Sequence, residues 1–79
     1  MEQLHTPRLT QREVEVLLWA ASGKTAPQTA HLLDISKDTV NFHMKNCLRK
    51  LSVENKTAAA AKATALGLLH MKDVRNPVE

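Results

Sequence analysis

Four side chains between residues 41 and 49 combine amide, cationic and aromatic groups: Asn41, Phe42, Lys45 and Arg49. An apolar stripe recurs at helical spacing through the same segment: Val40, Met44, Cys47 and Leu51. At about 100° per residue, the first set lies roughly 100° to 200° round the helix from Val40, away from the stripe. Amides and cations hydrogen-bond to base edges, and apolar groups meet thymine methyls. The pattern over residues 36–51 therefore predicts a helix that reads a DNA groove.

The charge near this segment supports that interpretation. Residues 37–50 contain one acid, Asp38, and four cations, Lys37, Lys45, Arg49 and Lys50, although the net charge of the whole chain is only +3. A local excess of cations is what a phosphate-binding surface requires. Phe42 has a second explanation, because single exposed apolar residues are normal on soluble domains.

The composition predicts one small domain with an aliphatic core. The chain has 79 residues, of which 43% are apolar but only 3% are aromatic. A chain of this length buries a modest share of its surface, so we expect a stability of only a few kcal/mol. A partner subunit would increase it.

The residues that could support catalysis or metal binding lack suitable neighbours in the sequence. His43 precedes Cys47 by four residues, but two candidate ligands do not make a zinc site. His5, His31 and His70 have no catalytic partners. The single cysteine indicates a reduced thiol, and we see no signal peptide or membrane span. The sequence thus predicts a cytoplasmic protein that is not an enzyme and needs no cofactor.

Capping signals divide the chain into four helices. Thr10 and Glu13 form a capping box that begins the first helix, whose expected buried stripe is Val14, Leu17, Leu18 and Ala21. Gly23 is suited to the left-handed residue that ends it. A second capping box, Thr25 with Gln28, opens a short helix through Leu33.

The second and third helices are predicted to form a helix-turn-helix. Asp34 tolerates left-handed geometry in the turn, and Ser36 caps the third helix. Ala30, Ile35 and Val40 stand where such a pair packs tightly. The expected fold is an all-α four-helix bundle that contains this motif.

The fourth helix, expected from about Lys56 to Leu68, is apolar on nearly every side. One face, about Ala59, Ala63 and Leu66, can serve the core of the domain. The opposite face is predicted to form a homodimer: Ala58, Ala61, Ala65 and Leu68. The alternative is that alanine is simply the best helix former and tolerates exposure.

Three segments resemble, in order and spacing, the LuxR/GerE-type DNA-binding domain of bacterial transcription regulators: LTQREVEVLLWAASGKT, LLDISKDTVNFHMKN and KLSVENKTAAA. The similarity covers about residues 9–69 and is specific, because the L-T-x-R-E start, the G-K-T and the I-S-x-x-T-V turn occur together. Trp19 and the Asn41-Phe42-His43 run look more like acyl-homoserine-lactone (quorum-sensing) receptors than phosphorylated response regulators.

The resemblance implies that the third helix enters the major groove, the second braces it and the fourth makes the homodimer. When the family's roles are carried over by position, the residues expected to contact bases are Asn41, Phe42 and Lys45. The residues expected to contact phosphates are Lys24, Thr25, Ser36, Thr39, Asn46 and Arg49. The expected target is an inverted repeat in double-stranded DNA, whose half-sites lie about one helical turn apart.

Two departures from the family pattern stand out. Thr29 replaces a usual isoleucine, which predicts looser packing and lower stability, and Lys56 stands where arginine is common. We expect a linker at 1–8, the domain at 9–69 and a tail at 70–79. There is no room for the family's ligand-binding domain, so the chain is expected to be an excised output domain or a stand-alone GerE-like regulator.

Two further alternatives stay open. Trp19, with Val16 and Ala20, forms a second apolar edge on the first helix, either as ordinary packing or as a dock for a regulatory domain or RNA polymerase. A helical protein-interaction module is the rival to DNA binding. Retention on duplex DNA that falls steeply as salt is raised would support DNA binding, and no retention would favour the protein-interaction module.

Overall fold

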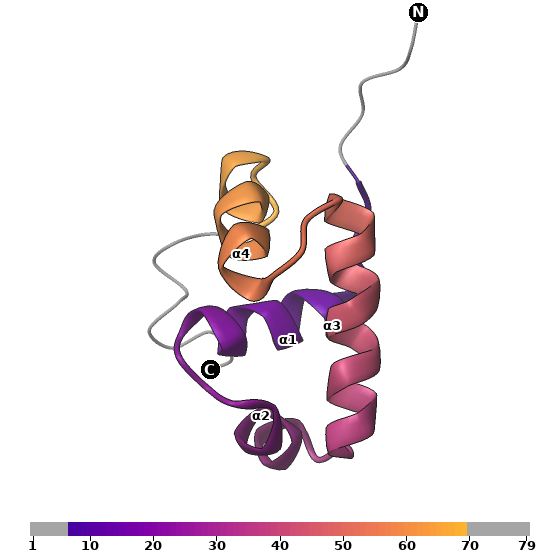
Figure 1. The fold of residues 1–79 in the computed structure, drawn as a ribbon. Helices are drawn as coiled ribbons and strands as arrows, with labels where there is room; N and C mark the ends of the chain where they lie inside the picture. Colours follow the sequence, from indigo (N-terminus) through magenta and orange to yellow (C-terminus); the bar gives the residue numbers. More distant parts are fainter. Residues whose placement is uncertain (1–6, 70–79) are drawn as a thin grey trace, which may run out of the picture.

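The computed structural model describes residues 7–69, which form four α-helices and, over that range, no strand. The helices are α1 (Gln11–Ala21), α2 (Ala26–Leu33), α3 (Lys37–Leu51) and α4 (Lys56–Ala65). Figure 1 shows α1 at the centre, with α2 and α4 toward opposite ends of the longer α3. Both α1 and α3 contact each of the other three helices. The all-α prediction is confirmed, while most of the expected linker and all of the tail lie outside the described residues.

Side-chain caps begin all four helices, as their sequences require. In α1 the Thr10 hydroxyl accepts from the Glu13 backbone N–H at 3.1 Å, and the Thr10 N–H donates to Glu13 Oε1 at 2.9 Å. Thr25 and Gln28 repeat this arrangement at the start of α2. Ser36 and Asn55 each accept one backbone N–H at the starts of α3 and α4. These bonds satisfy donors that the first turn of a helix leaves without partners.

The turns use the residues that the sequence suggested. Gly23 follows α1 with φ of 97°, and Asp34 lies between α2 and α3 in the left-handed region with φ of 58°. The Ile35 N–H donates to the Ala30 carbonyl at 3.0 Å, which closes the turn of the helix-turn-helix. The left-handed conformation of Ser52, at the end of α3, was not predicted.

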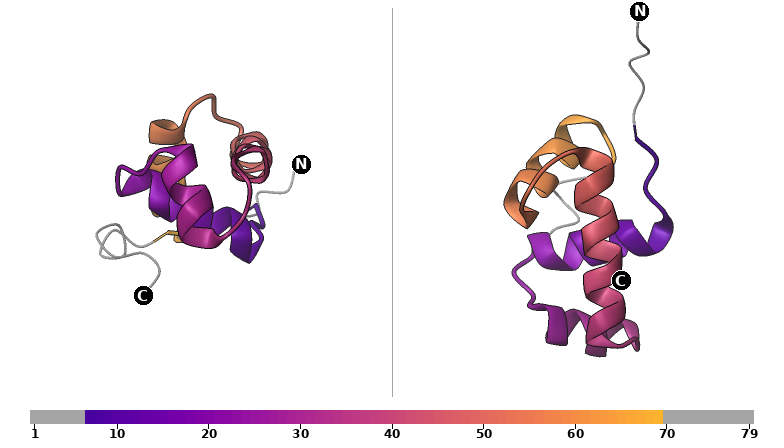
Figure 2. Two further views of the ribbon diagram at one scale, coloured as in Figure 1. Left: turned by 90° about the horizontal axis from the view of Figure 1, so that it is seen from below. Right: turned by 45° about the vertical axis from the view of Figure 1, so that its right-hand side comes forward.

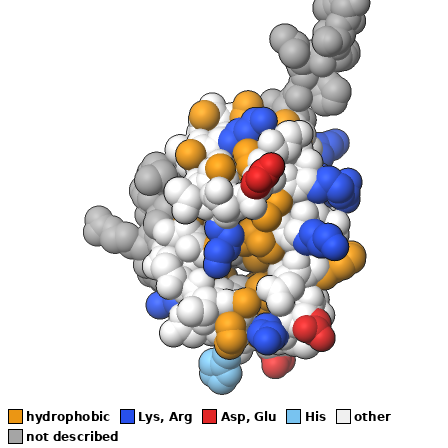
Figure 3. Space-filling model, in the orientation of Figure 1, with side chains coloured by type: hydrophobic (Ala, Val, Ile, Leu, Met, Phe, Trp, Pro, Cys, Tyr) orange, Lys and Arg blue, Asp and Glu red, His pale blue; other side chains and the backbone are white. Residues whose placement is uncertain are grey.

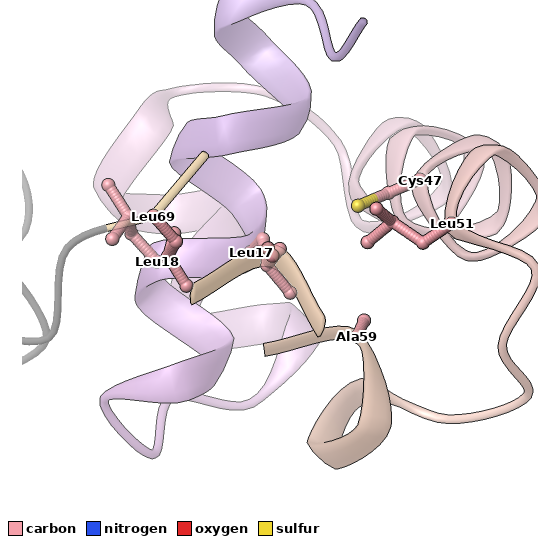
Figure 4. Packing of buried hydrophobic residues seen from close by; sticks show 7 residues of the cluster. Leu17, Leu18, Cys47, Leu51, Ala59 and Leu69 are labelled. Carbon is pink, nitrogen blue, oxygen red and sulfur yellow. The ribbon is translucent and has the colours of Figure 1, made fainter. Parts of the chain in front are cut away.

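Two apolar clusters hold the helices together. The larger joins α1, α3 and α4, and Figure 4 shows Leu17 centrally within it, with Cys47 and Leu51 on one side and Leu18 and Leu69 on the other. The smaller cluster joins α1, α2 and α3 through three buried residues: Val16, Ala30 and Val40. Ile35 packs against it, so the predicted contact between the two helices of the motif is confirmed.

The predicted buried stripe of α1 was only half right. Leu17 and Leu18 are buried, but Val14 and Ala21 are half-buried, and Val16 is only 1% exposed. The reason is the central place of α1: it contacts all three other helices, so a single stripe cannot supply its buried surface. Val16 therefore belongs to the core and not to a free second edge.

The predicted end of α4 at Leu68 was wrong. The helix ends at Ala65, because Gly67 adopts φ of 78° and the Leu68 N–H turns back to the Ala63 carbonyl at 2.8 Å. This is the bond pattern of a glycine C-cap. Leu68 thus lies after the helix and packs against the larger cluster, while Leu66, which was expected in the core, is 37% exposed.

Candidate nucleic-acid interface

Helix α3 lies at the edge of the molecule, with one side turned away from the other helices (Figures 1 and 2). Its apolar stripe faces inward as predicted: Val40, Cys47 and Leu51 are buried, and Met44 is half-buried between the two clusters. Burial of this stripe fixes which side of α3 remains accessible.

The accessible side carries the three residues predicted to contact bases: Asn41, Phe42 and Lys45, here called the reading face. All three are exposed, and the Phe42 side chain is 61% exposed, more than any other large apolar residue of the described chain. The rings of Phe42 and His43 meet edge to face, with centroids 5.5 Å apart. An exposed aromatic ring thus lies on the same side of α3 as an amide and a cation.

The residues predicted to contact phosphates lie at the starts of α2 and α3 and along α3. Thr25, Ser36 and Arg49 are exposed, whereas Lys24, Thr39 and Asn46 are half-buried. The Thr25 and Ser36 hydroxyl oxygens accept capping bonds from Gln28 and Thr39 at 3.2 and 3.0 Å. Arg49 Nη2 donates to Asn46 Oδ1 at 3.2 Å, so these two side chains act as one polar unit. Figure 3 shows Lys and Arg side chains along the side where α3 lies.

One residue near the reading face was missed from the sequence. Lys56, noted only as a departure from the family, lines a shallow cleft of about 30 Å³ together with Lys24 and Asn41. The three residues lie in different segments of the chain, so the periodicity of a single helix could not predict that they lie close together. Lys24 and Lys56 therefore border the same cleft as Asn41.

Of the four cations counted in residues 37–50, Lys50 is half-buried and the other three are exposed. Its ammonium Nζ donates to Glu13 Oε1 on α1 at 2.8 Å. Burial by itself would raise the pKa of Glu13, but hydrogen bonds from Lys50 and Thr10, with the positive charges of Lys50 and His43, lower it below its ordinary value. Glu13 is thus an ionised, buried partner, a role that its place in the capping box did not reveal.

The cysteine is not activated. Cys47 is fully buried, and burial, together with the negative charge of Glu13, raises the pKa of its thiol to about 11. Within residues 7–69 no three His, Cys, Asp or Glu side chains lie close enough to hold a metal ion. Over the same range no helix is long and apolar enough to cross a membrane.

The predicted dimerisation residues are only partly accessible. Ala61 and Ala65 are exposed on α4, and Ala58 is half-buried. Leu68 is half-buried after the end of the helix. A groove of about 570 Å³ between α1 and α4 includes Ala61 in its lining. Figure 3 shows apolar side chains in the region where α4 lies.

Trp19 is more enclosed than an open docking edge would be. The residue is half-buried on α1, and its indole Nε1 is buried with no hydrogen-bond partner in the described part of the chain. Ala20 is half-buried beside it. The ring therefore packs against the domain along much of its surface.

Comparisons with known proteins agree with this arrangement. The family model for bacterial regulatory proteins of the luxR family matches residues 7–63. The chain is 52% identical over 64 residues to the HTH-type quorum sensing-dependent transcriptional regulator RpaR of Rhodopseudomonas palustris. The match covers 81% of this chain and 26% of RpaR. It is 52% identical over 61 residues to the HTH-type quorum-sensing regulator RhlR of Pseudomonas aeruginosa, covering 77% of this chain and 25% of RhlR.

A solved structure supports the same assignment at the level of the fold. The structure of the transcription factor GerE superposes with a TM-score of 0.76 at 30% identity, covering 80% of this chain and 94% of that one. The chain spans about a quarter of the length of the curated relatives named above. It therefore belongs to the luxR family of bacterial regulatory proteins, as a helix-turn-helix DNA-binding domain of transcription regulators, which are not enzymes.

Proposed function

We propose that the reading face of α3 enters the major groove of DNA and distinguishes its bases. The observation that carries this proposal is the outward exposure of Asn41, Phe42 and Lys45 on a helix whose opposite side is buried. Asn41 has the groups to bond adenine bidentately, Lys45 to bond the acceptors of guanine, and Phe42 to meet a thymine methyl.

The polar residues around this face hold the duplex by its phosphates. These residues are Lys24, Thr25, Ser36, Thr39, Asn46 and Arg49. The Thr25 hydroxyl uses an oxygen lone pair for the cap, so its O–H proton still serves as a donor. The Ser36 and Thr39 hydroxyls bond each other at 2.8 Å, which leaves one O–H proton of the pair to donate. Lys56 joins this set because it shares a cleft with Lys24 and Asn41. Such contacts supply most of the affinity and make it depend on salt.

The exposed side of α4 forms a homodimer that recognises an inverted repeat. Ala58, Ala61 and Ala65 lie on this helix, and small side chains allow two backbones to approach closely. Leu66 takes the place that Leu68 was expected to fill, since Leu66 is exposed and Leu68 packs against the core. Two copies of α3 would then lie about 34 Å apart, one turn of DNA.

The names of the relatives support a regulatory context for this domain. Two of them are named as quorum-sensing regulators, and each is about four times longer than the matched region. The domain thus acts in the cytoplasm as the DNA-binding output of a quorum-sensing regulator, whose small-molecule ligand is bound elsewhere. RNA polymerase is the expected further partner when the regulator activates transcription.

Selection of bound sites from random duplexes tests the proposal directly. The expected result is a palindromic sequence whose half-site centres are separated by about one helical turn. Binding to nonspecific duplex DNA should also fall steeply as salt is raised. Failure to enrich any sequence, with no retention on duplex DNA even at low salt, would favour a protein-interaction module instead.

The dimer is tested separately by Ala61→Glu. A charge on the exposed side of α4 should convert the dimer to a monomer in analytical ultracentrifugation and weaken binding to the two-half-site duplex. Binding to a single half-site should stay unchanged. Gln11→Glu adds the same charge at another exposed position, the start of α1, and is the control that should leave the dimer intact. A dimer that survives Ala61→Glu places the interface elsewhere.

A further inference from the structure

One ion pair joins two helices that are far apart in the sequence. Lys50 on α3 bonds Glu13 on α1 at 2.8 Å, across 37 residues. The Glu13 side chain is 4% exposed and that of Lys50 is 28% exposed. The other ion pair of the described chain, Arg12 with Glu15, lies within α1 and is more exposed.

The carboxylate of Glu13 is a fixed anchor for this bond. It is the third residue of α1, and its Oε1 also accepts the Thr10 backbone N–H at 2.9 Å. The Thr10 hydroxyl holds the Glu13 backbone in turn. A carboxylate that is buried and bonded to its own helix cannot follow a moving lysine, so Lys50 must come to it.

The position of Lys50 on α3 makes the bond sensitive to rotation. At about 100° per residue, Lys50 lies roughly 80° to 100° round the helix from the centre of the buried stripe, and about 130° from the reading face. Apolar contacts have no preferred direction and tolerate a small turn of α3 about its axis. A hydrogen-bonded ion pair at the flank has a narrow range of distance and angle, so it resists that turn.

Both ends of α3 pack against an apolar cluster, and the end that carries Cys47 and Leu51 has the ion pair in addition. Near its start, Val40 packs with Val16 and Ala30 in the smaller apolar cluster. Near its end, Lys50 is tied to α1, about 15 Å further along the axis. A buried ion pair contributes little net stability compared with an apolar pair of similar volume. In some proteins, however, such a pair fixes the geometry of the fold.

We propose that Glu13 and Lys50 are positioning residues for sequence recognition. Their bond sets the rotation of α3 and hence the angle at which Asn41, Phe42 and Lys45 meet the bases, without either residue touching DNA. The inference rests on the proposed function of the reading face. Correct bases are distinguished by short directional bonds, so a rotated helix loses discrimination while its contacts with phosphates persist.

The test is a comparison of specificity between the unmodified chain and the double variant Glu13→Gln/Lys50→Met. The glutamine oxygen still accepts from the Thr10 N–H, and no charge is left buried without a partner, so the fold should survive. The duplex obtained by selection and a scrambled duplex serve as probes, and active protein is counted by titration. We expect the ratio of the two affinities to fall about tenfold, comparable to one lost base contact.

The dependence of binding on salt supplies the second measurement. It should be the same for the double variant and the unmodified chain, because no phosphate contact is removed. If Lys50 instead contacts a phosphate, the slope of log affinity against log salt will shrink by about 0.9. That result would overturn the inference, as would an unchanged specificity ratio.

Two controls complete the design. Arg12→Met/Glu15→Gln removes the ion pair that lies within α1 and should leave both measurements unchanged. Lys50→Arg keeps a cation within reach of Glu13, so this variant should retain most of the specificity of the unmodified chain. If the unmodified chain itself shows no preferred sequence, the proposed function of the reading face has failed, which is a different result from an unaffected double variant.

Discussion

At the scale of single residues, three neighbours near the end of α3 have different environments. Arg49 is exposed and bonds Asn46, Lys50 reaches Glu13, and Leu51 is buried in the larger cluster. Each step along the helix turns the side chain by about 100°, so adjacent residues face solvent, a flank and the core. Charge alone therefore does not identify the cations that can meet DNA.

Lys45→Ala should identify a base contact. Lys45 is exposed on the reading face, and its loss should cost about 1–3 kcal/mol on the selected duplex and relax the preference at one base pair. The measurement is affinity for a panel of single-base variants of the duplex. An equal loss on every sequence would make Lys45 a phosphate contact.

Arg49→Ala is the matched comparison on the same helix. Because Arg49 is predicted to contact a phosphate, its removal should weaken all sequences alike and reduce the salt slope by about 0.9. The sequence preference should be unchanged. A slope equal to that of the unmodified chain would remove Arg49 from the contacts.

At the scale of elements, the starts of the helices could be predicted because their causes are local. Thr10 with Glu13 and Thr25 with Gln28 bond within four residues, and the inward stripe of α3 follows from its own periodicity. The end of α4 was missed, since Gly67 was read as part of an alanine-rich helix. Its left-handed turn accompanies packing of Leu68 and Leu69 against the core.

Contacts between elements were harder to predict. The core role of Val16, the cleft shared by Lys24 and Lys56, and the bond of Lys50 to Glu13 all depend on how helices cross. No spacing along the chain encodes these crossings. The sequence thus predicts which residues of α3 face outward, but not what holds that helix in place.

Thr29→Ile should stabilise the domain. Thr29 is 2% exposed and borders the shallow cleft beside Val16 and Val40, where a larger apolar side chain can fill space. We expect the free energy of unfolding to rise by about 1 kcal/mol. Thermal unfolding followed by circular dichroism should show a rise in Tm of about 4–8 °C.

Thr29→Val is the control for the hydroxyl, because it keeps the branched shape and adds no length. If Val stabilises and Ile does not, the cleft is too small for the added methylene. A fall in Tm for both variants would show that the Thr29 hydroxyl itself supports the fold.

At the scale of the whole molecule, α1 organises the domain. It contacts the other three helices, contributes to both apolar clusters and carries Glu13, which reaches α3. The orientation of α3, the helix proposed to read DNA, therefore depends on its packing against α1. Changes in the charge of Glu13 should consequently affect global stability.

Stability should fall in acid through Glu13. The pKa of Glu13 is lower in the folded chain than its ordinary value of 4.5, so the ionised form favours folding. This contribution is present above about pH 4.5 and is lost as the pH falls through the lower, folded value. Chemical denaturation between about pH 6 and 3 should show the decline, and Glu13→Gln should flatten it. An identical decline in Glu13→Gln would assign it to other carboxylates.

The buried thiol on α3 can report how often that helix separates from the rest of the domain. The thiolate is the form of cysteine that attacks alkylating reagents, and buried Cys47, with a pKa of about 11, offers almost none of it while α3 is docked. Because the chain has a single cysteine, every modified molecule records one opening event. The rate of labelling under native conditions therefore reports the frequency of local opening at the helix proposed to read DNA, with no engineered probe.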